Sequence, residues 1–147
     1  MSSRYTYSMS VEIEYPFEFV IEGTAVSFQA KRRASVEQWK ARVIEASRSR
    51  LPEGHFASRD ALAITLYYFP NADMQGDLDN IVKPILDALA RHIYLDDRQI
   101  HRLLVQKFEP GNVFRFAAPS PVLNDALNAV KPVLYVRLSN NPFEDLV

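Results

Sequence analysis

The apolar run at positions 61–70 restricts the fold of this chain more than any other segment. The run, ALAITLYYFP, has no charged side chain and stops at Pro70, so it predicts a strand in the middle of a sheet. A strand is also expected over 15–22, where Phe17, Phe19 and Ile21 share one face and Gly23 follows. Further strands are expected over 98–110 and 132–138. On the former, Ile100 and Leu104 are expected on one side, with Leu103 and Val105 near the other.

Helical spacing of apolar residues predicts a helix in each interval between these strands. The first is expected to begin at Ser35, because Ser35 and Gln38 form a capping-box pattern, and to bury Trp39 and Val43. The second is expected from about Asp79 to about His92, and a short third one near Ser120. The buried stripe of the second comprises Ile81, Val82, Ile85, Leu86, Leu89 and Ile93. The β-α-β-α-β-α-β order predicts an α/β or α+β fold, with a small mixed β-sheet covered by helices.

Length and composition favour one domain and exclude several kinds of site. The 147 residues suit a domain over 13–139, with a flexible arm at 1–12 and a polar, acidic tail at 140–147. A net charge of -1 excludes a uniformly basic nucleic-acid coat, so DNA binding would need a local basic patch. The absence of cysteine excludes disulfides, cysteine-ligated zinc, iron–sulfur clusters and thiol catalysis.

Targeting signals are not expected in this sequence. The N-terminal stretch MSSRYTYSMSVEIE has no apolar core of a signal peptide, and no stretch approaches the roughly 20 apolar residues of a membrane span. A cytoplasmic location is therefore the expectation.

Two acidic pairs lie close together in the stretch GDLDNIVKPILDALARHIYLDDRQI, residues 76–100. Asp77 and Asp79 stand at the start of the second helix, where carboxylates are favoured and where Asp79 alone is best explained as an N-cap. Asp96 and Asp97 suit a solvated turn. Lys83 follows Asp79 by four residues, and a surface ion pair is favoured two to one over a role beside a phosphate.

Taken together, these carboxylates suit a hard divalent cation. With no cysteine and few histidines, Mg²⁺ or Mn²⁺ is favoured over zinc. The ligands would be Asp77, Asp79 and Asp97, with Asp96 as a ligand or a neighbour of one. Whether Asp97 returns to Asp79 is not decided by sequence spacing. The histidines are interpreted as structural, and an imidazolium is expected to be favoured at the end of the second helix; they are His55, His92 and His101.

The joint pattern D-x-D-N-x-x-K, then D-A-L, then D-D-x-Q-[IV] resembles the signature of the RusA-type Holliday junction resolvases, and every element of that signature is present. A looser similarity extends over residues 17–108. The resemblance implies a compact α/β homodimer and a Mg²⁺-dependent endonuclease that makes symmetric nicks across four-way DNA junctions. It implies that Asp77, Asp79 and Asp97 are catalytic, metal-binding acids and that Lys83 is the catalytic lysine. Asn80 would brace the loop, and Asp87, in the D-A-L element, is interpreted as structural.

Phosphate contacts are expected from the basic segment at 31–50, which holds seven basic and two acidic residues. The candidates are Lys31, Arg32, Arg33, Lys40 and Arg42, although a solvated helix face explains any one of them equally well. Three other functions stay open: a nuclease of branched, flapped or phage DNA, a catalytically silent junction-binding module, and a regulatory domain whose C-terminal tail docks to another protein.

Overall fold

The computed structural model describes residues 11–144 and 146, and its elements follow the expected order. The strands and helices are β1 (Phe17–Glu22), α2 (Arg33–Arg48), β2 (Leu62–Phe69), α3 (Val82–Leu89), β3 (Ile100–Lys107), α4 (Pro121–Asn128) and β4 (Val133–Ser139). Two 3₁₀ helices, η1 (Leu78–Ile81) and η2 (Asp97–Gln99), precede α3 and β3. Residues 1–10, which hold most of the expected arm, lie outside the described part. Val11, which is described, forms a bridge with His55.

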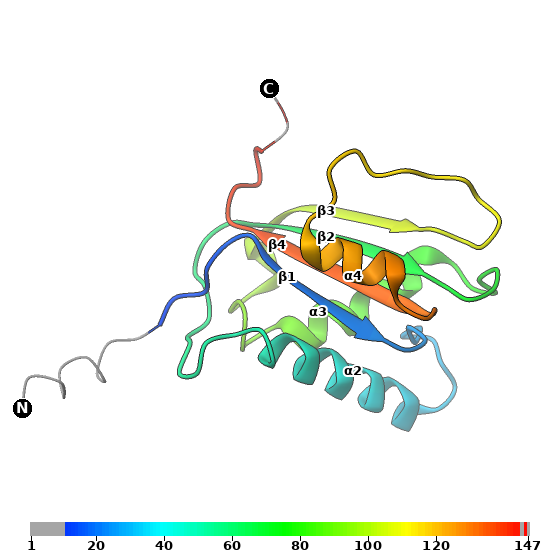
Figure 1. Ribbon diagram of the computed structural model, residues 1–147. Coiled ribbons are helices and arrows are strands. Elements are labelled where there is room, and N and C mark those ends of the chain that lie inside the picture. Colours follow the sequence, from blue (N-terminus) through cyan, green and yellow to red (C-terminus); the bar gives the residue numbers. More distant parts are fainter. Residues whose placement is uncertain (1–10, 145, 147) are drawn as a thin grey trace, which may run out of the picture.

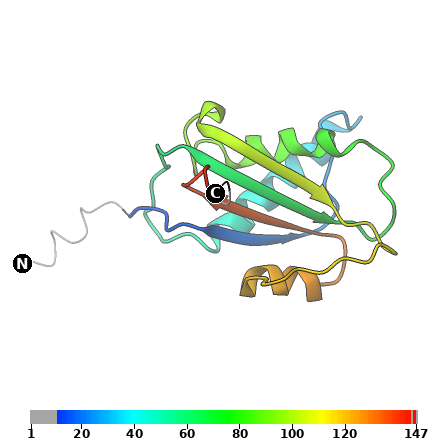
Figure 2. The same cartoon turned by 90° about the horizontal axis from the view of Figure 1, so that it is seen from above.

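A four-stranded mixed sheet forms the centre of the molecule, with strand order β1-β4-β2-β3 (Figures 1 and 2). β4 pairs antiparallel with both β1 and β2, whereas β3 pairs parallel with β2. The central position of β2 confirms the prediction from its apolar run, since both of its faces are largely buried. The parallel pair needs a crossover connection, which η1 and α3 supply. The D-x-D motif lies at the start of this connection, after β2, and the D-D motif lies at its end, before β3.

One face of the sheet is covered by α2 and α3 (Figure 1). Phe17, Phe19 and Ile21 point into this interface, as the alternation along β1 predicts. From α2, Trp39 and Val43 pack against the same core. The burial expected for the stripe of the second helix is also confirmed, with Ile93 beyond the end of α3. Four of its residues are buried, and Val82 and Leu86 pack against the core while partly exposed.

The opposite face of the sheet is only partly covered. A smaller apolar cluster joins α4 to one end of the sheet through Leu123, Ala126, Phe69, Val133 and Tyr135. Beside it lies a cavity of about 460 Å³ between the sheet, residues 116–120 and the C-terminal segment. From the expected tail, Glu144 lines this cavity: Arg137 donates to its carboxylate at 2.6 Å and Arg102 donates to its carbonyl oxygen at 2.7 Å.

The start of the first helix differs from the prediction. α2 begins at Arg33, and Arg32 precedes it without a side-chain cap. Ser35 lies inside the first turn, where its N–H donates to the Arg32 carbonyl at 3.1 Å. The expected capping box at Ser35 and Gln38 is therefore wrong. Good helix formers at 33 and 34 start the helix two residues earlier than the capping pattern indicates.

The second helix is shorter than predicted. It starts as the 3₁₀ turn η1, preceded by Asp77 rather than by Asp79, and α3 ends at Leu89. Ala90 is extended and Arg91 takes a left-handed conformation with φ 76°, so the chain leaves the helix before His92. The prediction of an imidazolium at a helix end is also wrong. Burial and the charge of Arg48 lower the pKa of His92 to about 4, and its Nε2 lies 2.8 Å from the Ser47 hydroxyl.

The two sides of β3 also differ from the prediction. A register shift between Leu62 and Ala63 places Leu62 opposite Ile100 but Ala63 opposite Arg102. Ile100 and Val105 consequently pack on the α2–α3 side, while Leu104 borders the cavity on the other face. The prediction that Ile100 and Leu104 share a side is wrong because a single irregularity in pairing reverses the alternation of all later residues.

Candidate functional site

The D-x-D segment (residues 76–80) lies at the N-terminal end of the η1–α3 helix. Asp77 precedes η1 in an extended conformation, its carbonyl accepts the Asn80 N–H at 3.1 Å, and it makes no side-chain capping hydrogen bond. Asp77 and Asp79 are both exposed. Asp77 borders a cavity of about 290 Å³ between residues 70–77 and the loop after β1, where Asp73 also lies. The carboxylates of Asp77 and Asp79 thus lie in the favourable field of a helix start, and no capping hydrogen bond holds the Asp77 side chain.

Asn80 connects the D-x-D segment to the loop between β1 and α2. Its carbonyl oxygen accepts the N–H of Phe28 at 3.0 Å, and its side-chain amide donates to Gln29 Oε1 at 3.5 Å. This loop leads directly to Lys31, Arg32 and Arg33. The contacts therefore bring the start of the basic segment close to the acidic one.

The D-D turn (residues 94–99) is held by a capping box. Asp96 Oδ1 accepts the N–H of Arg98 at 2.8 Å, and Gln99 Oε1 accepts the N–H of Asp96 at 2.9 Å. The Gln99 amide also donates to the carbonyls of Ser58 and Asp60, at 2.8 and 3.0 Å. The Arg98 side chain pairs with Asp96 Oδ2 at 3.1 Å, and its hydrogen bond is the main cause that lowers the pKa of Asp96. Asp96 thus acts as a cap, with both oxygens engaged.

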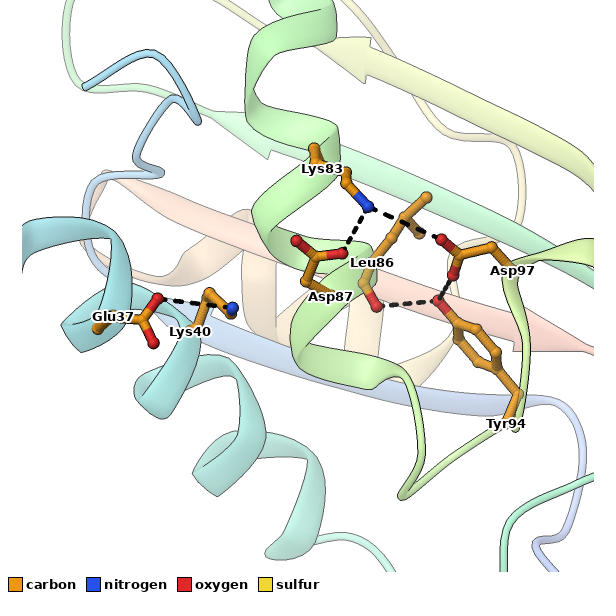
Figure 3. A network of polar contacts seen from close by, with 7 residues as sticks. All are labelled: Glu37, Lys40, Lys83, Leu86, Asp87, Tyr94 and Asp97. Carbon is orange, nitrogen blue, oxygen red and sulfur yellow. Dashed lines mark hydrogen bonds and ion pairs between the residues drawn. The ribbon is translucent and has the colours of Figure 1, made fainter. Parts of the chain in front are cut away.

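Asp97 lies beside α3, held between two side chains (Figure 3). Its Oδ1 accepts a hydrogen bond from the Tyr94 hydroxyl at 3.0 Å, and its Oδ2 lies 4.0 Å from Lys83 Nζ. Tyr94 is completely buried. Burial, and then the charge of Asp97, raise the pKa of Tyr94, so its hydroxyl stays protonated and remains a donor. The turn after α3 therefore folds back far enough to bring Asp97 to Lys83.

Lys83 lies between two carboxylates. Its ammonium donates to Asp87 Oδ1 at 2.8 Å and faces Asp97 at the longer distance (Figure 3). The hydrogen bond to Asp87 is the largest cause that raises the pKa of Lys83. The i,i+4 ion pair expected from the sequence is present, but it joins Lys83 to Asp87 rather than to Asp79. Lys83 is thus a protonated cation with more than half of its side chain exposed.

The structure brings together some of the predicted site residues but not all. Asp97 and Asp87 lie close to Lys83, which follows Asp79 by four residues, and η1 packs against β3. Within residues 11–144 and 146, however, no three Asp, Glu or His side chains lie close enough to hold one metal ion. The arrangement is thus two adjoining groups: the free carboxylates of the D-x-D segment, and Asp97 with its fixed neighbours.

The candidate phosphate contacts fall into two groups. Lys31, Arg32 and Arg33 are exposed. Lys40, which lies on the neighbouring helix α2 in Figure 3, pairs with Glu37 at 3.5 Å. Arg42 instead donates to the Glu22 carbonyl at the end of β1 and lies against Gly23. Arg42 therefore has a structural role, because this contact connects the end of β1 to α2.

The supporting contacts of two residues in the site, Gln99 and Tyr94, were not predicted from the sequence. Gln99 was part of the D-D-x-Q motif, and its spacing from Asp96 is that of a capping box, so this signal was available. Tyr94 gave no comparable signal, because nothing in its spacing shows that its hydroxyl reaches Asp97 or the Leu86 carbonyl, 2.9 Å away. Both residues support the D-D turn.

In the part of the chain that the structure describes, no helix is long and apolar enough to cross a membrane. No curated protein matches this sequence. A family does match: Endodeoxyribonuclease RusA, over residues 8–115. The matched region includes the basic loop, the D-x-D segment, Lys83 and the D-D turn, and it ends before α4. The match covers well over half of the chain and agrees with the mixed sheet, and the chain therefore belongs to the RusA endodeoxyribonuclease family.

Proposed function

We propose that this protein is a Mg²⁺-dependent endodeoxyribonuclease that resolves Holliday junctions by paired symmetric nicks, in DNA recombination and repair. Membership of the RusA family supports a DNA endonuclease. The observation that carries the proposal is the place of Asp97. Although distant in the sequence from the D-x-D segment, it lies 4.0 Å from the Nζ of Lys83, and Lys83 follows Asp79 by four residues on the helix that begins after Asp77.

The donor atoms near this helix start suit Mg²⁺ or Mn²⁺. Asp77, Asp79 and Asp97 offer only carboxylate oxygens, which are hard ligands, and all three residues are exposed enough to reach an ion. Asp96 is the weaker candidate, because Arg98 and the capping box occupy its oxygens. When bound, the cation would polarise the scissile phosphate and lower the pKa of an attacking water. Since the three acids do not yet form one group, binding requires the D-x-D segment to approach Asp97.

Lys83 serves as a fixed positive charge in this proposal. Its raised pKa keeps the amine protonated at neutral pH, so it neutralises charge on the phosphate and does not act as a general base. Asp87 keeps the ammonium in place through the 2.8 Å hydrogen bond. The ammonium can move away from Asp97 and still keep its hydrogen bond to Asp87, because the contact with Asp97 is the longer and weaker of the two.

DNA would reach the site along the basic segment. Lys31, Arg32 and Arg33 follow the loop that Asn80 contacts, so their charges lie near the D-x-D segment. Lys40 adds a charge on α2, whereas Arg42 supports binding only indirectly, through the end of β1. Interactions of this kind with phosphates fix the position of the DNA without reading its sequence. Replacing one such basic side chain by a neutral one should also reduce the salt dependence of DNA binding by about one unit of slope.

The proposed enzyme acts as a homodimer. A four-way junction has two-fold symmetry, and a symmetric dimer presents two equivalent sites to two equivalent strands. The C-terminal residues 140–147 hold none of the proposed metal ligands. Their contact with another protein stays a prediction, supported by the exposure of Phe143 beside the anchored Glu144.

A substrate panel tests the function. Labelled four-way junction, Y-fork, flap and linear duplex are incubated with the protein in Mg²⁺, in Mn²⁺ or in EDTA. Paired symmetric nicks in the junction alone, lost in EDTA, are expected. Cutting of every branched form would replace the resolvase by a broader nuclease of branched or phage DNA. Binding without cleavage under any condition would leave only a silent junction-binding module and would refute the enzyme.

A further inference from the structure

The two carboxylate oxygens of Asp97 have different surroundings, and this difference suggests a role for Tyr94. Oδ1 accepts the Tyr94 hydroxyl at 3.0 Å, whereas Oδ2 faces Lys83 at 4.0 Å, beyond hydrogen-bond distance. We propose that Tyr94 is a positioning residue: its hydroxyl holds Oδ1 so that Oδ2 is presented to the divalent cation. The inference rests on the proposed function, since it deepens the metal site described there.

Tyr94 is suited to this role because its ring is packed in the core. It is among the largest fully buried side chains, and its backbone bridges to Ala90 and Ser58. The side chain of Asp97, in contrast, is about half exposed. An exposed carboxylate loses rotational freedom when it binds a metal ion, and a hydrogen bond that already restricts it removes part of that cost. The rigid tyrosine therefore pre-orients a ligand that solvent would otherwise leave free to rotate.

The single proton of the Tyr94 hydroxyl belongs to Asp97 rather than to the other nearby acceptor. The Leu86 carbonyl lies 2.9 Å away, but it already accepts the N–H of Ala90 at 3.0 Å, as a helical carbonyl does. A carboxylate is the stronger acceptor, because hydrogen bonds to charged groups are stronger than those between neutral ones. Removal of the hydroxyl would thus leave Leu86 satisfied and affect mainly Asp97.

Tyr94→Phe tests the assignment, since it keeps the ring and removes only the hydroxyl. Mn²⁺ binding without DNA is measured by calorimetry, so the result does not depend on cleavage. The variant should bind Mn²⁺ about 10-fold more weakly, the usual effect of losing a partner that orients a metal ligand. The matched control is Tyr135→Phe, which removes another buried tyrosine hydroxyl from a carboxylate, Glu18, on the opposite face of the sheet. It should bind Mn²⁺ like the wild type.

A double-mutant cycle with Asp97→Asn separates this inference from the proposed function. If Tyr94 acts through Asp97, Tyr94→Phe should weaken Mn²⁺ binding no further in the Asp97→Asn background. Loss of Mn²⁺ affinity in Asp97→Asn, with normal affinity in Tyr94→Phe, would overturn the role of Tyr94 and leave the metal site standing. Normal affinity in Asp97→Asn would refute the metal site itself.

A measurement that keeps the natural hydrogen bonds applies if Tyr94→Phe does not fold. 3-Fluorotyrosine is placed at position 94 or, as the control, at position 135, and its fluorine resonance is followed while Mg²⁺ is added. A shift at position 94 that saturates with metal binding, without one at position 135, supports the assignment. A resonance at position 94 that does not respond while calorimetry shows Mg²⁺ binding would overturn it.

Discussion

The D-x-D segment and the D-D turn each carry two aspartates, yet the fold treats them differently. The carboxylates of Asp77 and Asp79 are exposed at a helix start, and the Asp77 side chain makes no capping hydrogen bond. Arg98 donates hydrogen bonds to Asp96, and Tyr94 donates one to Asp97. Gln99 connects the turn to residues 58–60. One half of the proposed site is therefore prepared by folding, whereas the other half is left to be ordered by the cation and the DNA.

This difference agrees with the electrostatics of such a site. Three carboxylates forced together without a cation would repel one another, and their approach would raise their pKa values. An arrangement that fixes one acid and leaves two free avoids this cost until the metal arrives. Lys83, between Asp87 and Asp97, provides positive charge near the fixed half in the meantime.

The largest expected effect comes from the free half. Asp77→Asn and Asp79→Asn should each lower junction cleavage by at least about 10²- to 10³-fold, because they remove a charged ligand at the reacting phosphate. Junction binding should stay the same or strengthen, since a negative charge near the DNA is removed. Cleavage rates and gel-shift affinities are measured beside Asp125→Asn, which neutralises an exposed acid on α4. Cleavage by Asp77→Asn at the normal rate would show that the site is wrongly assigned.

Replacement of Lys83 should give the next largest effect on cleavage. Lys83→Met should lower the cleavage rate about 10²-fold, while Lys83→Arg, which keeps the positive charge, should retain more of it. Single-turnover rates at saturating protein separate this loss from weaker DNA binding. Equal activity of Lys83→Met and wild type would mean that the ion pair with Asp87 is only a surface contact.

Loss of the capping box should loosen the fixed half without replacing any proposed ligand. Gln99→Ala removes hydrogen bonds to four backbone groups and should destabilise the protein by about 1–2 kcal/mol, equivalent to about 2–8 °C in Tm. Gln106→Ala, at an exposed glutamine on β3, is the control for thermal unfolding. An unchanged Tm in Gln99→Ala would show that the turn does not depend on these hydrogen bonds.

The smallest expected effect is a dependence on pH in the segment that leads to the D-D turn. The pKa of His92 is about 4 in the folded state against an ordinary value of 6.5, so the unfolded chain binds a proton first as the pH falls. The stabilisation is complete above pH 6.5 and is lost as the pH falls toward 4, by about 1 kcal/mol at pH 5 after allowance for partial exposure of the ring. Denaturant unfolding of wild type and His92→Gln at pH 7 and pH 5 checks this. A wild-type loss over this range that His92→Gln reproduces in full would exclude His92 as its source.

The strands were predicted from the sequence more accurately than the helix ends and side-chain contacts around the site. The alternation in β1 and the apolar run in β2 report burial, which the whole sheet enforces, and these predictions are confirmed. Helix ends depend on single residues: the left-handed Arg91 ends the second helix early, and Ser35 does not cap the first. The motif identified the acids and Lys83 as candidates, but the partners of Asp97 depend on how far the turn folds back, which residue spacing does not encode.

A crystal of the protein soaked in Mn²⁺ tests most directly whether the two halves form one site. The anomalous signal of the ion locates it without reference to activity. The account predicts an ion about 2.1 Å from carboxylate oxygens of both the D-x-D segment and Asp97, with Tyr94 still bonded to Asp97 Oδ1. An ion bound at Asp77 alone, with Asp97 still beside Lys83, would contradict it.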